Sequence, residues 1–206
     1  MATQLKSRPQ PTKAAGPAVD TGIRGIHHLV FNTDDMKKTL DFYVGILGLR
    51  LVHGLKTELR DADQILYRGN LWHDKCRHYF LDMGSDSLLA FFEVPVEGRV
   101  SDSNAVGAMQ HCAFTTTPSR YDELRQRLVE NDVEIIEDDE QGPLSSFYFR
   151  DPNGIRLEVS TALDRPEDDG VVASCILPEK MMRDELLTLC NDEKWVDQMM
   201  ATVPKG

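Results

Sequence analysis

The sequence predicts an α+β fold made of two βαβββ modules and a helical C-terminal extension. Two stretches of the chain run through the same order of one strand, one helix and three further strands. Each stretch opens with a histidine in an apolar strand, His28 or His111, and closes with a glutamate in another, Glu93 or Glu158. Because a carboxylate among apolar neighbours is costly unless it is paired or binds a metal, the repeat also indicates a functional site.

Apolar spacing and turn residues define the elements of the first module, at about residues 23–98. Strands are expected at residues 25–32, 49–53, 78–83 and 88–94, and a helix between the first two. Asp34 and Asp35 put negative charge at the positive end of the dipole of that helix, and Gly48 ends it. The run Gly84-Ser85-Asp86-Ser87 predicts a hairpin turn between the last two strands.

The second module, at about residues 107–161, repeats this order in a shorter chain. Strands are expected at residues 110–116, 133–136, 145–149 and 155–160. Thr117 and Pro118 open the helix, at a position where the missing N–H of proline costs nothing.

The extra length of the first module falls between His53 and Arg77, a segment too long for an ordinary strand connection. Such loops often bind substrate or cover a site, and a solvated surface loop is the alternative. The candidate substrate-binding residues are Asn32 in the first strand and Arg60, Tyr67, Arg68, Trp72 and His73 in the insertion.

Composition excludes several classes of function. A net charge of -11 without clustered lysine and arginine argues against nucleic acid and against an anionic membrane surface. No apolar run approaches the roughly 20 residues that span a bilayer. Residues 1–22 are poor in large apolar side chains and are expected to form a disordered tail without the apolar core of a signal peptide. We therefore expect a cytoplasmic protein with four reduced cysteines.

Residues 162–206 lie beyond the repeat. An acidic, proline-containing linker at Asp164–Gly170 precedes apolar residues at helical spacing. A helix or helix pair that packs on the modules is the first interpretation, with a dimer contact or a lid over the site as alternatives.

Several motifs resemble those of the vicinal oxygen chelate superfamily, which includes glyoxalase I, extradiol dioxygenases and bleomycin-resistance proteins. They are His28-Leu29-Val30, Asp35, Asp41-Phe42-Tyr43 and Leu47-Gly48-Leu49, and the run from Phe147 through Asp151-Pro152-Asn153-Gly154 to Glu158. The resemblance covers about residues 23–161. It implies the glyoxalase/dioxygenase fold, in which paired βαβββ modules enclose one divalent metal ion.

The resemblance also implies a set of metal ligands and a reaction. Carried over position by position, the ligands are His28, Glu93, His111 and Glu158, and Fe, Ni, Co, Mn or Zn would suit them. The metal would hold adjacent oxygens of a small substrate and stabilise an enolate, which implies a glyoxalase-like lyase or isomerase. Glu158 and Glu93 are the candidate bases, and Tyr148 is a further catalytic candidate.

Two alternatives stay open. An Fe(II) ring-cleaving dioxygenase would use His28, His111 and Glu158, with Tyr148 ten residues before Glu158 where the extradiol enzymes place a tyrosine, although the upstream histidine is absent. A metal-free protein of the bleomycin-resistance kind would bind its ligand without chemistry. Glutathione is not expected as a cosubstrate, because Asn32 and Glu97 replace the arginine and asparagine of glutathione-binding members. We expect a homodimer. Members of the superfamily pair their modules either within one chain or between two chains, and both arrangements stay open here.

Overall fold

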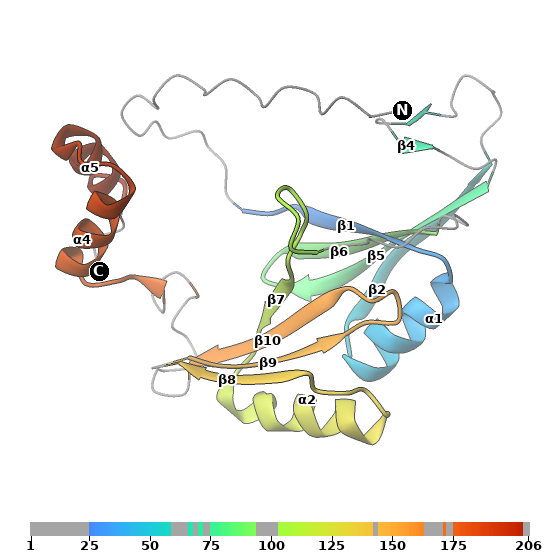
Figure 1. The fold of residues 1–206 in the computed structure, drawn as a ribbon. Helices are drawn as coiled ribbons and strands as arrows, with labels where there is room; N and C mark the ends of the chain where they lie inside the picture. The colour runs from blue at the N-terminus through green and yellow to red at the C-terminus, as the bar shows by residue number, and fades with distance from the viewer. Residues whose placement is uncertain are drawn as a thin grey trace, which may run out of the picture. The chain divides into compact units, whose positions relative to one another are not determined.

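The computed structural model describes residues 25–58, 66–67, 70–71, 75–93, 103–141, 144–162, 171 and 175–203 (Figure 1). One compact unit spans Gly25–Ser174 and contains both modules. The C-terminal helices belong to a second unit. The expected tail at residues 1–22 lies outside the described residues.

The first module contains the expected strand, helix and three strands. Its elements are β1 (His28–Thr33), α1 (Met36–Leu40) continuing as the π-helix η1 (Asp41–Ile46), β2 (Arg50–Glu58), β5 (Lys75–Gly84) and β6 (Ser87–Glu93). The sheet order is β1-β6-β5-β2, and β1 runs parallel to β6. The carboxylate of Asp35 caps α1 by accepting from Lys38 N–H. A short ribbon, β3 (Leu66–Tyr67) paired with β4 (Asn70–Leu71), was not predicted.

The second module has the same topology. It consists of β7 (Cys112–Thr115), α2 (Pro118–Glu130), β8 (Glu137–Gln141), β9 (Leu144–Arg150) and β10 (Arg156–Ala162), with sheet order β7-β10-β9-β8. The two matching sheets confirm the predicted repeat and fold class.

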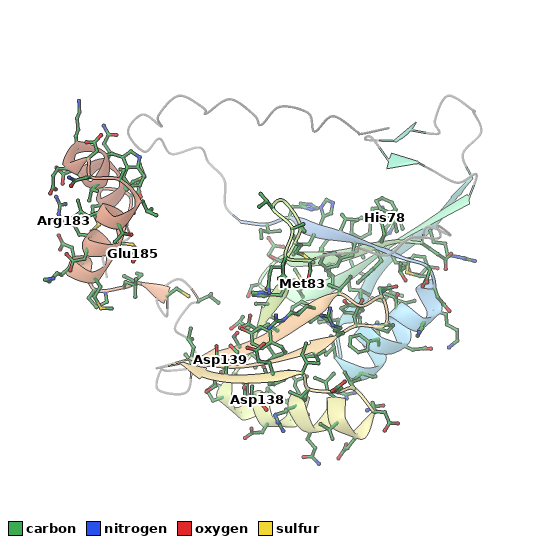
Figure 2. The ribbon with its side chains drawn as sticks, in the orientation of Figure 1. His78, Met83, Asp138, Asp139, Arg183 and Glu185 are labelled. Atoms are coloured by element: carbon green, nitrogen blue, oxygen red, sulfur yellow. The ribbon has the colours of Figure 1, made fainter. Side chains whose placement is uncertain are left out.

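One expected strand, at residues 133–136, was misplaced, because the edge strand β8 begins only at Glu137. The apolar Val133 and Ile135 instead pack against the core from the preceding connection. Acidic residues are poor strand formers, but Arg156 and Arg125 form ion pairs with Glu137 and Asp138 of this strand. Figure 2 labels Asp138 and Asp139 on β8. An acidic edge also discourages pairing with another sheet.

The two modules share one apolar core. Phe42 of η1 packs against Phe149 of β9, with ring centroids 6.2 Å apart. The hydroxyl of Tyr43, which is fully buried, donates to Asp151 Oδ2 at 3.1 Å. Thr33 at the end of β1 bonds the side-chain oxygen of Asn153 at 2.9 Å. The Asp-Pro-Asn-Gly turn of the second module is therefore hydrogen-bonded to the first module.

Each sheet turns one face to this core and the other face away from it. In the first sheet, Leu89 and Phe91 of β6 belong to the core cluster. Side chains alternate along a strand, so Leu88, Ala90 and Phe92 lie on the opposite face. In the second sheet, the core side chains include Leu157 and Val159 of β10. We call the faces that point away from the core the open faces, and the candidate site lies on them.

The C-terminal unit contains two described helices, α4 (Glu179–Leu189) and α5 (Glu193–Met200), which confirm the predicted helical extension. Arg183 of α4 joins them through ion pairs with Glu193 and Asp197 of α5. Figure 2 labels Arg183 on this helix pair. In the described part of the chain, every helix is too short or too polar to cross a bilayer.

Candidate metal centre

The open face of the second sheet brings two of the predicted ligands together. Cys112 pairs in register with Leu157, and both belong to the core cluster. His111 and Glu158 therefore project from the opposite face. His111 Nε2 lies 2.9 Å from Glu158 Oε2. Glu158 is only 8% exposed, and such a buried carboxylate needs strong partners.

Hydroxyl groups surround the Glu158 carboxylate. Ser160 Oγ donates to Glu158 Oε1 at 2.5 Å, and Ser146 Oγ lies 2.7 Å from Ser160 Oγ. Burial alone would raise the pKa of Glu158, but hydrogen bonds from Ser160, Ser146 and Tyr148 and the nearby His111 outweigh it and lower the pKa below its ordinary value. The carboxylate therefore stays ionised, as a metal ligand must.

Tyr148 lies beside both ligands. It pairs in register with Glu158 across β9 and β10, and its ring meets the His111 ring edge-on at 5.8 Å. Burial raises the pKa of the Tyr148 phenol, and the charge of Glu158 raises it further. Arg156 covers the Tyr148 ring, with its guanidinium carbon 4.4 Å from the ring centre. Tyr148 therefore remains a protonated phenol that can donate a hydrogen bond.

His28 lies on the open face of the first sheet. It pairs in register with Leu88, so it shares a face with Ala90 and with the exposed side chains Val30 and Asn32. The His28 ring contacts Phe80 of β5 edge-on at 5.7 Å. Phe80 also contacts His53 and His78, and His78, labelled in Figure 2, stacks on Phe92 at 3.7 Å. Aromatic rings therefore surround this predicted ligand.

The structure does not bring Glu93 to His28. The residue opposite Glu93 in β1 is Thr33, at the other end of the strand from His28. Glu93 also has the side-chain direction of Leu89 and Phe91, which face the core. Its Oε1 accepts from the N–H of Met36 at the start of α1 at 2.9 Å, and its Oε2 forms an ion pair with Arg77. In this chain Glu93 holds α1 to the sheet.

The matching topology of the modules shows which residue of β6 corresponds to Glu158. In the second module, Cys112 pairs with Leu157, so Glu158 lies two residues beyond the position level with His111. In the first module, His28 pairs with Leu88, and the residue two beyond Leu88 is Ala90. Ala90 of β6 therefore corresponds to Glu158 of β10. Alanine has no donor atom for a metal, so this position of β6 offers no counterpart to Glu158.

The chemistry of this donor pair suits a divalent ion, because imidazole nitrogen and carboxylate oxygen both bind such ions. His111 Nε2 and Glu158 Oε2, 2.9 Å apart, are in direct hydrogen-bond contact. Among the residues that the structure describes, no three histidine, cysteine, aspartate or glutamate side chains converge within one chain. His28 therefore does not join the pair in this single chain.

The predicted substrate-binding residues are only partly described. Asn32 lies exposed on the His28 face of β1. Tyr67 belongs to β3, although its side chain lies outside the described part, and Arg60, Arg68, Trp72 and His73 lie wholly outside it.

Sequence reasoning missed the residues that support the ligands, namely Ser146, Ser160, Arg156 and Phe80. Ser146 and Ser160 could have been found from strand alternation, because each stands two residues from Tyr148 or Glu158 and so shares its face. Phe80 could not have been found this way, because its contact with His28 depends on the pairing of β5 with β6.

Comparison with known proteins identifies the family. A model of the Glyoxalase/Bleomycin resistance protein/Dioxygenase superfamily matches residues 25–159, and the chain belongs to this superfamily. The metallothiol transferase FosB of Lysinibacillus sphaericus is 25% identical over 142 residues, which cover 68% of this chain and 83% of the relative. The glutathione transferase FosA of Serratia marcescens is 27% identical over 141 residues, or 66% of this chain and 80% of the relative.

Solved structures agree on the fold. A glyoxalase/dioxygenase from Nostoc punctiforme superposes with a TM-score of 0.52 at 23% identity, covering 74% of this chain and 100% of that one. A glyoxalase family protein from Enterococcus faecalis gives a TM-score of 0.51 at 22% identity, with 68% and 99% covered.

Proposed function

We propose that this protein is a divalent-metal enzyme whose ion is held by His28, His111 and Glu158. The observation that carries the proposal is the contact between His111 Nε2 and Glu158 Oε2, which are 2.9 Å apart and are both atoms of kinds that bind divalent ions. The Glu158 carboxylate is buried and accepts a hydrogen bond from the Ser160 hydroxyl. Fe, Ni, Co, Mn or Zn suits two imidazoles and one carboxylate. When bound, such an ion supplies a Lewis acid that polarises an oxygen of a small chelating substrate.

The protein groups around the ion have distinct tasks. The three ligands leave up to three of six positions for substrate and water. Tyr148 hydrogen-bonds Glu158 and keeps its proton because its phenol pKa is raised; on releasing Glu158 it can donate that proton in a hydrogen bond to an oxygen that gains negative charge. Glu158 is a poor candidate for the base, because its pKa is lowered. Glu93 is a poor one too, because it faces the core side of its sheet.

Group transfer is the reaction class best supported. The lyase or isomerase expected from the sequence depended on Glu93 as a fourth ligand, whereas the register puts Ala90 at that position. The names of the curated relatives support transfer of a thiol. In such a reaction the thiol loses its proton, the sulfur bonds to a carbon of the substrate, the C–O bond at that carbon breaks, and the freed oxygen takes up one proton. Asn32 and the insertion after His53 are the proposed contacts for the substrate.

A ring-cleaving dioxygenase is the second candidate. Two histidines and one carboxylate are the ligand set of many Fe(II) oxygenases, and Tyr148 lies beside Glu158. This candidate requires oxygen, whereas thiol transfer, lyase and isomerase reactions proceed without it.

We further propose a homodimer in which two copies complete two sites. His28 lies on one open face, and His111 and Glu158 lie on the other, without converging in the described part of one chain. A twofold dimer could place the His28 face of each copy against the His111 face of its partner. Val30, on the His28 face, is 39% exposed and would be covered.

Metal analysis followed by assays with and without oxygen tests the proposed function. The purified protein should contain a divalent ion and should be stabilised by adding it, because a ligand that binds only the folded state raises its stability. Metal-loaded protein should consume a thiol in the presence of oxygen-bearing electrophiles under anaerobic conditions. Oxygen uptake with a yellow product from a catechol would establish the dioxygenase instead. Absence of any bound ion would favour a metal-free binding protein.

A further inference from the structure

We propose that Ser160 and Ser146 are positioning residues that restrict Glu158 to binding metal through one oxygen, Oε2. This inference rests on the metal centre proposed above. It concerns how the carboxylate binds, and it therefore sets how many positions on the ion remain for substrate.

The two oxygens of Glu158 have different surroundings. Oε2 faces His111 Nε2 at 2.9 Å, on the side where an ion would sit. Oε1 accepts the hydrogen bond from Ser160 Oγ at 2.5 Å. A hydrogen bond from a hydroxyl to an ionised carboxylate is short and about twice as strong as a neutral one. Oε1 therefore has a protein donor, and the orientation of the carboxylate is fixed.

The serines are held in place by the sheet. Ser146 of β9 and Ser160 of β10 are register partners, and their hydroxyl oxygens lie 2.7 Å apart. A serine has one proton to donate. Ser160 gives its proton to Glu158, and Ser146 also stabilises the ionised Glu158 carboxylate. The two serines therefore act together on this one carboxylate.

This arrangement has a consequence for how Glu158 binds an ion. A carboxylate can bind a metal through one oxygen or through both. The hydrogen bond from Ser160 stabilises negative charge on Oε1, uses one of its two lone pairs and fixes the orientation of the carboxylate, which favours binding through Oε2 alone. With Glu158 bound through Oε2 alone, the three ligands occupy three positions and leave the others for a chelating substrate.

The decisive experiment compares Ser160→Ala with Ser160→Thr in the full-length protein loaded with Co(II). The visible absorption spectrum of Co(II) reports its coordination, and competition with a chelating dye gives its affinity. Ser160→Ala should change the spectrum and lower the affinity about 10- to 100-fold, as loss of an outer-shell partner does. Ser160→Thr keeps the hydroxyl and should restore both. Ser146→Ala should shift both readouts in the same direction as Ser160→Ala, by a smaller amount.

Ser145→Ala is the matched control, because Ser145 is also buried on β9 but its side chain lies on the opposite face from Ser146. It should leave the spectrum and the affinity unchanged. If Ser160→Ala fails to fold, Ser146→Ala carries the test alone. Co(II) bound by the Ser160→Ala and Ser146→Ala proteins with the wild-type spectrum and affinity would overturn this inference and leave the metal centre intact. A wild-type protein that binds no Co(II) would overturn both.

Discussion

The hydrogen bond between Tyr43 and Asp151 should make a measurable contribution to stability, and Tyr43→Phe removes it. Phenylalanine can keep the ring contacts of Tyr43 with Phe42 and Phe91, at 5.1 and 4.7 Å. The hydroxyl that donates to Asp151 Oδ2 at 3.1 Å is then the main loss.

The size of the loss follows from the surroundings of Asp151. A hydrogen bond to a charged group contributes about 1.5–3 kcal/mol. Asp151 Oδ2 would still accept from Asn153 Nδ2 at 3.0 Å, so the carboxylate is not left without a donor. We therefore expect a loss of about 1.5–2 kcal/mol, or about 3–8 °C in Tm for a chain of this size.

Urea unfolding at neutral pH, followed by circular dichroism, measures this loss. Tyr79→Phe removes a hydroxyl from another tyrosine packed against the core and should cost less than about 0.5 kcal/mol. A double-mutant cycle with Asp151→Asn isolates the interaction between Tyr43 and Asp151. A coupling energy near zero would refute the idea that this bond fastens the two modules together.

Three further predictions follow from the same structure. Burial raises the pKa of Asp151 above its ordinary 3.8. The protonated carboxyl therefore contributes to the free energy of unfolding in full below pH 3.8, and this contribution is lost as the pH rises through the pKa of the folded protein. Urea midpoints measured from about pH 4 to 7 should show wild type losing stability relative to Asp151→Asn as the pH rises. Glu93→Ala removes the acceptor for Met36 N–H and should cost about 1.5–3 kcal/mol in urea unfolding, while metal affinity stays within about twofold. Finally, His28→Ala and Glu158→Ala proteins, each inactive alone, should regain activity after mixing and refolding, because a mixed dimer contains one intact site. Continued inactivity of a verified mixed dimer would argue for sites completed within one chain.

Local features of the sequence predicted most of the fold. The helix start just after Asp34 and Asp35 and the helix start at Pro118 depend only on neighbouring residues, and the structure has both. The acidic strand β8 was missed because its formation depends on distant arginines, Arg125 and Arg156, as well as on pairing with β9.

The candidate site was predicted less evenly, for a physical reason. A histidine and a glutamate in apolar strands can be recognised from sequence, but the face on which each lies depends on strand register. Cys112 pairs with Leu157, so their neighbours His111 and Glu158 lie together on the face opposite to that pair. Glu93 is five residues from Leu88, the partner of His28, and lies on the other face. The placement of His28 relative to His111 depends on how whole sheets assemble, which no local pattern encodes.

Metal content per chain in a set of single variants tests the central claim most directly. Wild type, Glu93→Ala and His53→Ala should each retain about one divalent ion after dialysis, since His53 is a histidine on the His28 face that is not proposed as a ligand. His28→Ala, His111→Ala and Glu158→Ala should each lose most of it while remaining folded. Retention of the ion by His111→Ala and Glu158→Ala, or its loss from Glu93→Ala, would contradict the three-ligand metal centre.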